Sequence, residues 1–476
     1  MWFDNLKEKR LWEYFNEISS VPRDSWKEDG IRAFLLDWAE KHDVKAVVDR
    51  TGNVIMKKAA TPGMENKAPV ALQGHMDMVC VRREGSKHDF TKDPIEIVLE
   101  NGVIHAKDTT LGADNGIALA MILTLFTDDD YEHGPLEAIC TVNEEVGLTG
   151  AFGLEGKYVD ARMLINIDNE EEGFFCIGCA GGLDVVESRK LEKKPVTEGE
   201  TVAVEFSSLL GGHSGSDINK GRCNAIMAFA RFLTSLPSYR LVSVQGGTKR
   251  NVIPSALKAE LVVPSAKDAE KTAKLLQDIL RVEFCKGDPD VTITVKKTEK
   301  AADAVTAEDS RKIASALLTA PNGVQAYSQT LEGIVETSCN LAIVKVDGEK
   351  AEVTYSIRSS IESAKKNVAK IITTVYESYG FSSSVGDGYP GWLPNPESPI
   401  AKKLPEAYRK LTGKEPVVTA IHAGLECGII NDRIPGMDSI SIGPNLFDVH
   451  SVNEHLEVES AERVLSFLKA TLKDLV

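Results

Sequence analysis

The stretch APVALQGHMDMV, residues 68–79, sets a short apolar run directly before a glycine, His75 and Asp77. An apolar run of this length is typical of a buried strand. Residues i and i+2 of an extended stretch point to the same side, so the Asp77 carboxylate can reach the His75 ring. There it fixes the tautomer that a metal needs. By itself, the pair is weak evidence for a metal site, and a surface turn with two unrelated polar residues explains it better.

Strand-like and helix-like segments alternate on both sides of this stretch. VKAVVD (44–49) and NVIMKKA (53–59) predict a hairpin, and PLEAICTV (135–142) and ARMLINID (161–168) predict further buried strands. NGIALAMILTLFTDD (115–129) has the apolar spacing of a helix between them. Strands and helices in this order predict an α/β domain with a mixed, mostly parallel sheet.

The pattern changes after about residue 190. LEKKPVTEGE (191–200) is a polar linker, and half-exposed strands and polar helices follow it, which predicts an inserted α+β domain with an antiparallel sheet. SVGDGYPGWLPNPESPI (384–400), dense in Gly and Pro, marks a second boundary. A helix at 401–413, a strand at 438–443 and a helix at 460–476 then return to the first pattern. We therefore expect a catalytic domain from 1–188 and 389–476, with 189–388 inserted.

The composition limits the class of protein. The 476 residues carry a net charge of −16, which argues against nucleic acid and anionic membranes as partners. The N-terminal segment has no apolar core or cleavage site of a secretory signal, and no apolar run approaches a membrane span. We expect a cytoplasmic protein.

The eight cysteines are expected to be mostly reduced core thiols, and the single C-x-x-C of Cys176 and Cys179 to be structural.

Further polar residues follow the predicted strands. Asp114 lies at a helix start, where ordinary N-capping is the simpler explanation. The acidic run 170–172 is expected to be a solvated loop. The carboxyl ends of strands form the edge where open α/β sheets build their sites, and histidines with surplus carboxylates suit two divalent cations. The candidates at that edge are His75, Asp114, Glu144, Glu145, Asp168, His450 and His455.

Six motifs in order give the chain a specific resemblance. GHMDMV, TTLGADNGIALA, NEEVGLTGA, NIDNEE, GGHSGSDI and HSVNEHL resemble the M20 family of di-metal peptidases, and most of all its aminoacyl-histidine dipeptidase branch. The resemblance covers nearly the whole chain. It implies two divalent ions, Zn²⁺ or else Co²⁺ or Mn²⁺, in the α/β domain. It also implies that the inserted domain is a lid through which a homodimer forms.

The resemblance assigns the metal centre residue by residue. It implies a metal-ligand set made up of His75, Asp114, Glu145, Asp168 and His450, with Asp114 bridging the ions. Asp77 orients His75, and the link from Asp114 to Asn115 is often cis in this family. His450 is preferred to His455 because it stands four residues before Glu454, as the family pattern requires. Glu144 is implied as the general base that takes a proton from the bridging water.

The resemblance also implies a substrate site. His213 is expected to polarise the scissile carbonyl in an active site, that of the partner subunit. Arg358 is expected to bind the terminal carboxylate of the substrate, although a solvated strand arginine is the alternative. Asn251, His422 and Gly424 are expected to line the pocket, where IHAGLECG (421–428) departs from the Gly-Gly-Thr/Ser loop of many relatives.

These features predict a metal-dependent exopeptidase for unblocked dipeptides, preferentially Xaa-His including β-alanyl-histidine. Two alternatives stay open within the superfamily, an aminotripeptidase and an N-acyl amino acid deacylase. A non-catalytic binding protein on the same fold is a third alternative, but loss of ligands would be its mark, and every expected ligand is present.

Overall fold

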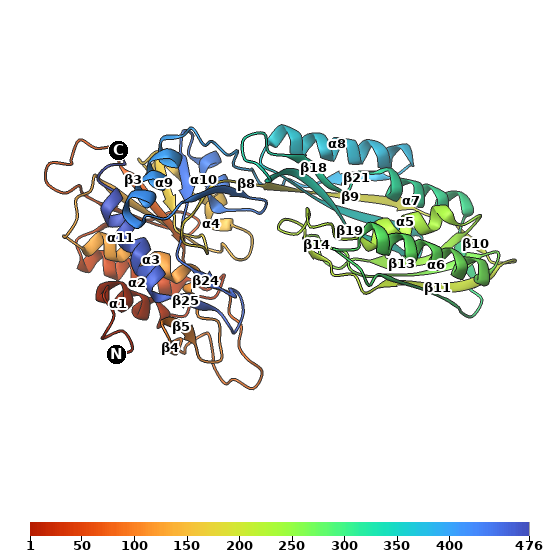
Figure 1. Cartoon of the computed structure of the whole chain (residues 1–476), viewed down its shortest axis with the longest axis horizontal. Helices are drawn as coiled ribbons and strands as arrows, with labels where there is room; N and C mark the ends of the chain where they lie inside the picture. The colour runs from red at the N-terminus through yellow and green to blue at the C-terminus, as the bar shows by residue number, and fades with distance from the viewer. Residues whose placement is uncertain (476) are drawn as a thin grey trace. The chain divides into compact units, whose positions relative to one another are not determined.

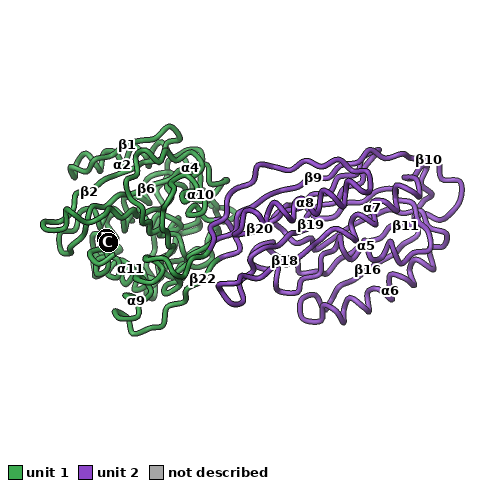
Figure 2. The backbone as a smooth tube through the Cα atoms, turned by 90° about the horizontal axis from the view of Figure 1, so that it is seen from above, with its two compact units in different colours: residues 1–178, 394–420, 425–476 green, residues 179–393, 421–424 purple. Residues whose placement is uncertain are grey.

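The computed structural model describes residues 1–475 and divides into two compact units. Unit 1 comprises residues 1–178, 394–420 and 425–476, and unit 2 comprises residues 179–393 and 421–424 (Figure 2). The four-residue return of the chain into unit 2 was not anticipated from the sequence. The end of the last predicted helix, residue 476, lies outside the described residues.

Unit 1 is built on an eight-stranded sheet with the order β1-β2-β6-β3-β7-β23-β8-β22. Its strands are β1 (Lys45–Val48), β2 (Val54–Lys58), β3 (Val70–His75), β6 (Leu136–Thr141), β7 (Met163–Asn166), β8 (Phe174–Cys179), β22 (Val417–Ile421) and β23 (Asp438–Ser441). The strands β6, β3, β7 and β23 run parallel, whereas β1, β2 and β8 pair antiparallel. The predicted mixed α/β sheet is therefore confirmed, and the carboxyl ends of its parallel strands share one edge.

Unit 1 also carries helices and a small second sheet. The helices are α1 (Lys9–Ser19), α2 (Asp29–Lys41), α3 (Ala113–Thr127), α4 (Thr149–Gly153), α9 (Pro399–Thr412), α10 (Glu426–Arg433) and α11 (Val458–Thr471), with a 3₁₀ turn at Gly156–Tyr158. The helix α3 lies against β3 and is covered by α1, so nearly all of its side chains are buried. The second sheet has the order β24-β25-β5-β4, from β4 (Ile97–Glu100), β5 (Val103–Ala106), β24 (Leu446–Phe447) and β25 (His455–Glu457).

Unit 2 is an α+β unit on a nine-stranded antiparallel sheet, as predicted. Its strands are β9 (Gly181–Lys190), β11 (Glu200–Ser207), β13 (Arg240–Gly246), β15 (Leu257–Val263), β16 (Thr292–Lys297), β18 (Gly323–Tyr327), β19 (Val335–Asp347), β20 (Lys350–Ser359) and β21 (Ser382–Val385). One face is covered by α5 (Ala225–Ser235), α6 (Ala266–Glu283), α7 (Ala307–Thr319) and α8 (Glu362–Ser378) (Figure 1). Two short ribbons pair β10 (Lys193–Pro195) with β17 (Asp303–Val305) and β12 (Gly212–His213) with β14 (Val252–Ile253). The expected linker 191–200 thus contributes a paired strand.

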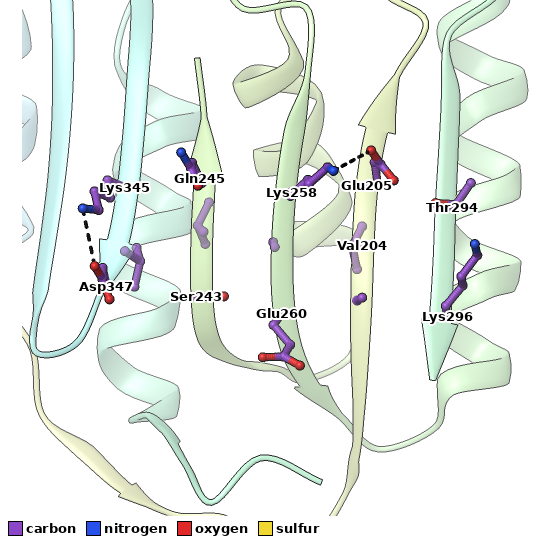
Figure 3. Close-up of a pocket in the computed structure, with 14 residues that line it drawn as sticks. Val204, Glu205, Ser243, Gln245, Lys258, Glu260, Thr294, Lys296, Lys345 and Asp347 are labelled. Atoms are coloured by element: carbon purple, nitrogen blue, oxygen red, sulfur yellow. Dashed lines mark ion pairs between the residues drawn. The ribbon is translucent and has the colours of Figure 1, made fainter. Parts of the chain in front are cut away.

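The other face of this sheet is open and polar. Because side chains alternate along a strand, Val204 packs into the core whereas Glu205 faces outward. A shallow hollow of about 490 Å³ lies on this face, and the ion pairs of Lys258 with Glu205 and Lys345 with Asp347, both at 3.4 Å, cross it (Figure 3). Among the described residues, no helix combines the length and the apolar character that crossing a membrane requires.

The cysteines fit the expectation of core thiols. Six of the eight are buried, Cys80 is half-buried and Cys285 is exposed. Cys176 and Cys179 lie on β8 with exposed fractions of 2% and 1%, which agrees with a structural position.

Candidate metal centre and substrate cluster

His75 is the last residue of β3, and Asp77 contacts the Nδ1 side of its ring. Its Nδ1 lies 3.1 Å from the backbone oxygen of Asp77 and 3.3 Å from Oδ1 of the same residue. Asp77 is itself fixed, because it accepts hydrogen bonds from the Ser25 hydroxyl at 2.8 Å and the Glu144 backbone N–H at 3.0 Å. Both His75 and Asp77 are fully buried. A surface turn with unrelated polar groups is therefore excluded, and the Nε2 of His75 faces the site.

Asp114 lies between two histidines that are far apart in the sequence. Its Oδ1 is 3.0 Å from Nε2 of His75, and its Oδ2 is 3.1 Å from Nε2 of His450. The peptide bond from Asp114 to Asn115 is cis, as the resemblance implied. The simpler N-cap explanation is wrong, because Gly112 occupies the N-cap position of α3 and the Asp114 carboxylate points to the histidines.

The N-terminus of α3 is capped by a residue from the other end of the chain. The Glu454 carboxylate accepts backbone N–H groups of Leu111, Gly112 and Ala113 at 2.8, 3.0 and 2.8 Å. A carboxylate is favourable there because the unpaired N–H groups and the helix dipole present positive charge. The sequence pattern pointed to Glu454 only as a marker for His450. Its capping of the helix that carries Asp114 was missed.

Two further carboxylates complete the cluster. Oδ1 of Asp168 lies 3.5 Å from Nε2 of His75, and Oε1 of Glu145 lies 3.0 Å from Nε2 of His450. Ligand atoms fall within 4.8 Å of one another in three groups, namely His75 with Asp114 and Asp168, Asp114 with Glu145 and His450, and His75 with Glu144 and Glu145. Two half-sites therefore share Asp114.

The electrostatics of the cluster favour cations. Among the described residues, the ion pairs of Asp114, Glu145 and Asp168 involve histidines alone. Hydrogen bonds to Asp114 and Glu145 raise the pKa of His450 to about 11. Burial raises the pKa of Asp168 to about 6, with the Asp114 and Glu145 carboxylates adding to the effect. The surplus of negative charge at a buried site, with imidazole and carboxylate donors, fits divalent ions such as zinc.

Local contacts that the sequence did not reveal hold these strand ends together. The Asn115 side chain accepts the His75 N–H at 3.1 Å and donates to the Ile167 carbonyl at 2.7 Å, so it links the ends of β3 and β7. Its approach requires Gly74, where a Cβ would lie 2.4 Å from Oδ1 of Asn115. The buried Arg23 guanidinium donates to the backbone oxygen of Asp77 at 3.1 Å.

Two neighbouring segments lie outside the cluster. His455 belongs to β25, where its ring stacks on Phe447 at 5.0 Å and its Nδ1 lies 2.9 Å from the Asn453 carbonyl.

The acidic run 170–172 is only partly solvated. Glu170 and Glu171 are exposed, but the Glu172 side chain is 3% exposed and pairs with Arg463 at 2.7 Å, so the expected solvated loop is wrong for that residue.

A second polar cluster lies within unit 2, around Arg358 of β20. The guanidinium is 3.3 Å from the Tyr389 hydroxyl, 3.4 Å from the Ser214 hydroxyl and 3.5 Å from Nε2 of His213. Arg358 is 8% exposed, so it is not a solvated strand arginine. It forms no ion pair with any acidic side chain of the described chain. A buried guanidinium surrounded by neutral groups offers a site for an anion.

His213 comes from the same unit and is held as one tautomer. Its Nδ1 accepts the backbone N–H groups of Gly215 and Ser216, both at 3.3 Å. Burial, together with the charge of Arg358, lowers the pKa of His213, so the ring is neutral near pH 7. The backbone donors at Nδ1 favour the tautomer with the proton on Nε2, which can then donate a hydrogen bond to a carbonyl oxygen. Nη2 of Arg358, a donor itself, lies 3.5 Å from Nε2, which is long for a hydrogen bond.

The other expected pocket residues of this cluster lie close by. Nε2 of His422 is 2.7 Å from the Ser338 hydroxyl, and burial and Arg358 lower the pKa of His422 to about 4. A Cβ at Gly424 would lie 3.0 Å from the Tyr389 ring, so this close packing requires a glycine. Asn251 contributes its backbone oxygen, which accepts the Ser214 N–H at 2.9 Å, while its side chain is exposed.

Comparisons with known proteins agree with this geometry. Residues 71–474 match the sequence profile of peptidase family M20/M25/M40. The cytosol non-specific dipeptidase of Escherichia coli is 37% identical over 99% of this chain and 98% of its own length. The crystal structure of aminoacylhistidine dipeptidase from Vibrio alginolyticus superposes with a TM-score of 0.93 at 35% identity, and 99% of each chain is covered. Aminopeptidase PepT from Bacillus cereus, at 16% identity and a TM-score of 0.57 over 98% of this chain and 99% of its own, shares the fold alone.

Proposed function

This chain belongs to peptidase family M20/M25/M40, and from that membership we propose that it is a metal-dependent dipeptidase. Its substrates are unblocked dipeptides, preferentially Xaa-His, β-alanyl-histidine among them. The names of the two full-length relatives, one a dipeptidase and the other an aminoacylhistidine dipeptidase, support this substrate class. The observation that carries the proposal is the pair of half-sites that share the Asp114 carboxylate.

The cofactor that we propose is a pair of divalent ions, Zn²⁺ first and Co²⁺ or Mn²⁺ as alternatives. His75 and Asp168 would hold one ion, His450 and Glu145 would hold the other, and the Asp114 carboxylate would contribute to both half-sites. Support comes from distances of 3.0 to 3.5 Å between these imidazole nitrogens and carboxylate oxygens. When bound, the ions supply Lewis acidity, which polarises the scissile carbonyl and lowers the pKa of an adjacent water.

Glu144 is the proposed general base. It stands next to Glu145, and its carboxylate lies within 4.8 Å of the His75 and Glu145 ligand atoms while it forms no ion pair in the described chain. A carboxylate that faces the attacking water without serving as a ligand takes its proton and returns it to the leaving amine. Asp77 positions both the metal ligand His75 and the proposed base Glu144, because it contacts the His75 ring and accepts the Glu144 backbone N–H.

The cluster in unit 2 is the proposed substrate-recognition site. Arg358 binds the C-terminal carboxylate of the dipeptide, and the Nε2–H of His213 donates to the carbonyl oxygen on which negative charge develops. His422, Gly424 and Asn251 line the pocket. This assignment is supported by the buried guanidinium, which pairs with no acidic side chain of the described residues, and by the backbone N–H groups that face Nδ1 of His213.

The proposal extends to the setting of the enzyme. The inserted segment serves as a lid and dimerisation domain of a homodimer, as the family resemblance implies. The protein works in the cytoplasm, which the name of the Escherichia coli relative supports.

Metal analysis and substrate profiling test the function. The purified protein is expected to bind two equivalents of Zn²⁺ and to hydrolyse Ala-His and β-alanyl-histidine faster than tripeptides. N-acetyl amino acids are expected to remain intact, and turnover of acetylated substrates alone would refute a dipeptidase.

Two neighbouring variants separate the proposed roles of the glutamates. Glu144→Ala is expected to keep both ions and lose several orders of magnitude in kcat, because only the proton acceptor is removed. Glu145→Ala is expected to lose metal. If Glu144→Ala loses metal and Glu145→Ala keeps it, the two roles are exchanged. Unchanged hydrolysis by Glu144→Ala would remove Glu144 from the mechanism.

A further inference from the structure

A chain of buried hydrogen bonds crosses the sheet of unit 1 one row behind the metal-binding cluster. Glu426, the first residue of α10, is fully buried, and its Oε2 accepts from Nε2 of Gln73 at 2.5 Å and from the Thr141 hydroxyl at 2.7 Å. Oε1 of Gln73 accepts in turn from Nδ2 of Asn166 at 2.5 Å. The four side chains come from β7, β3, β6 and α10.

Two of the three strand residues in this hydrogen-bond chain stand two positions before a residue of the cluster. Gln73 precedes His75 by two positions, and Asn166 precedes Asp168 by two. Gln73 pairs with Asn166 in the parallel register of β3 with β7, while His75 pairs with Thr141 of β6. Side chains at i and i+2 of a strand point to the same face. Gln73 and His75 therefore share one face of β3.

Stability of the helix alone does not account for a carboxylate at this position. Burying a carboxylate costs free energy unless a cation or a full set of donors satisfies it. Glu426 has two neutral donors on Oε2, and among the described residues Oε1 has no hydrogen-bond partner. An apolar side chain here would pack against the sheet without that cost. What the carboxylate adds is a single acceptor atom that draws β3 and β6 together.

We propose that Glu426 is a positioning residue of the metal centre, whose carboxylate holds Gln73 and Thr141 so that the strand ends present the His75 and Asp168 donors at one fixed spacing. The inference rests on the proposed function, since it concerns the metal ligands.

Two variants of Glu426 test the role, with Co²⁺ as the probe. Glu426→Leu is expected to bind Co²⁺ about 10–100-fold more weakly, the usual loss when a group that orients metal ligands is removed. Its visible Co²⁺ absorption spectrum is expected to change, and kcat for Ala-His to fall while KM stays within about twofold. Glu426→Gln keeps an acceptor oxygen for Gln73 and Thr141, so it is expected to restore the wild-type affinity and spectrum.

A matched control is available on the same strand. Glu137 is a buried carboxylate at the opposite end of β6, where it accepts the Asp160 and Ala161 N–H groups at 3.0 Å each and pairs with Lys57. Glu137→Leu is expected to lower the melting temperature and leave the Co²⁺ affinity and spectrum unchanged. If Glu426→Leu behaves in the same way, or if Glu426→Gln binds Co²⁺ as weakly as Glu426→Leu, the positioning role is overturned.

Thr141→Val covers the case in which Glu426→Leu does not fold. It keeps the shape of the side chain and removes one donor, so Co²⁺ binding is expected to weaken less than in Glu426→Leu, and wild-type affinity in this variant overturns the inference. Failure of the proposed function is a separate result. In that case the wild-type protein itself neither binds Co²⁺ nor hydrolyses Ala-His.

Discussion

The guanidinium of Arg358 offers the sharpest test of substrate recognition. It is 8% exposed, and its three neutral neighbours lie at 3.3 to 3.5 Å, which is long for hydrogen bonds. A substrate carboxylate would give it two charge-assisted hydrogen bonds in a forked geometry. Hydrogen bonds to charged groups contribute about 1.5–3 kcal/mol each, so the pair amounts to roughly 3–6 kcal/mol. At about 1.4 kcal/mol per factor of ten, Arg358→Met is expected to lower kcat/KM by about 10²–10⁴.

The assay compares a dipeptide with its own amide. Wild-type enzyme is expected to prefer Ala-His over Ala-His amide by a factor of this size, and Arg358→Met to lose the preference, with most of the change in KM. Arg358→Lys keeps the charge but not the fork, so it is expected to recover only part of the rate. Arg231→Met is the matched control, because Arg231 is a partly exposed residue of the same unit, paired with Glu283 at 2.5 Å. If Arg358→Met keeps the wild-type preference, Arg358 does not bind the substrate carboxylate.

Three further perturbations have defined outcomes. Removal of divalent ions with a chelator is expected to abolish hydrolysis and lower the melting temperature, and Zn²⁺ to restore both, whereas full activity without metal would contradict the di-metal centre. Glu454→Ala, which uncaps α3, is expected to lower the free energy of unfolding in urea by about 1–2 kcal/mol and to weaken metal binding; unchanged Zn²⁺ affinity would separate the cap from the site. Burial raises the pKa of Glu187 to about 7 from an ordinary 4.5, so between pH 4.5 and 7 the folded carboxyl keeps a proton that the unfolded chain has released. The free energy of unfolding therefore falls as pH rises through this window, by at most about 3 kcal/mol. Glu187→Gln is expected to abolish that fall, which urea titrations at pH 5 and pH 8 measure. If the variant shows the same fall between the two pH values as the wild type, Glu187 is not its cause.

Much of the fold was predictable because its signals are local. The run before His75, the helix that begins near Asp114 and the strand before Asp168 all appear where the apolar patterns put them. Parallel strands bring their carboxyl ends to one edge, so the candidates at those ends were expected to meet. His75, Asp114, Glu145, Asp168 and His450 do lie together, and the structure also excludes the local alternatives of a surface turn and an N-cap.

The unpredicted features depend on contacts between distant segments. Arg358 was open to interpretation as a solvated strand residue, because only the fold brings it beside His213, 145 residues earlier. Glu172 was expected in solvent with its acidic neighbours, because its partner Arg463 lies 291 residues away.

The sequence by itself determined the strands, the ligand types and their order along the chain, because apolar periodicity and motif spacing act over a few residues. Only the tertiary structure decided how those ligands are held. Glu454 caps α3 from 343 positions along the chain, and Glu426 reaches Gln73 across 353. A carboxylate at such a distance leaves no local pattern, since its donors belong to other strands and helices and become neighbours only when the sheet has formed.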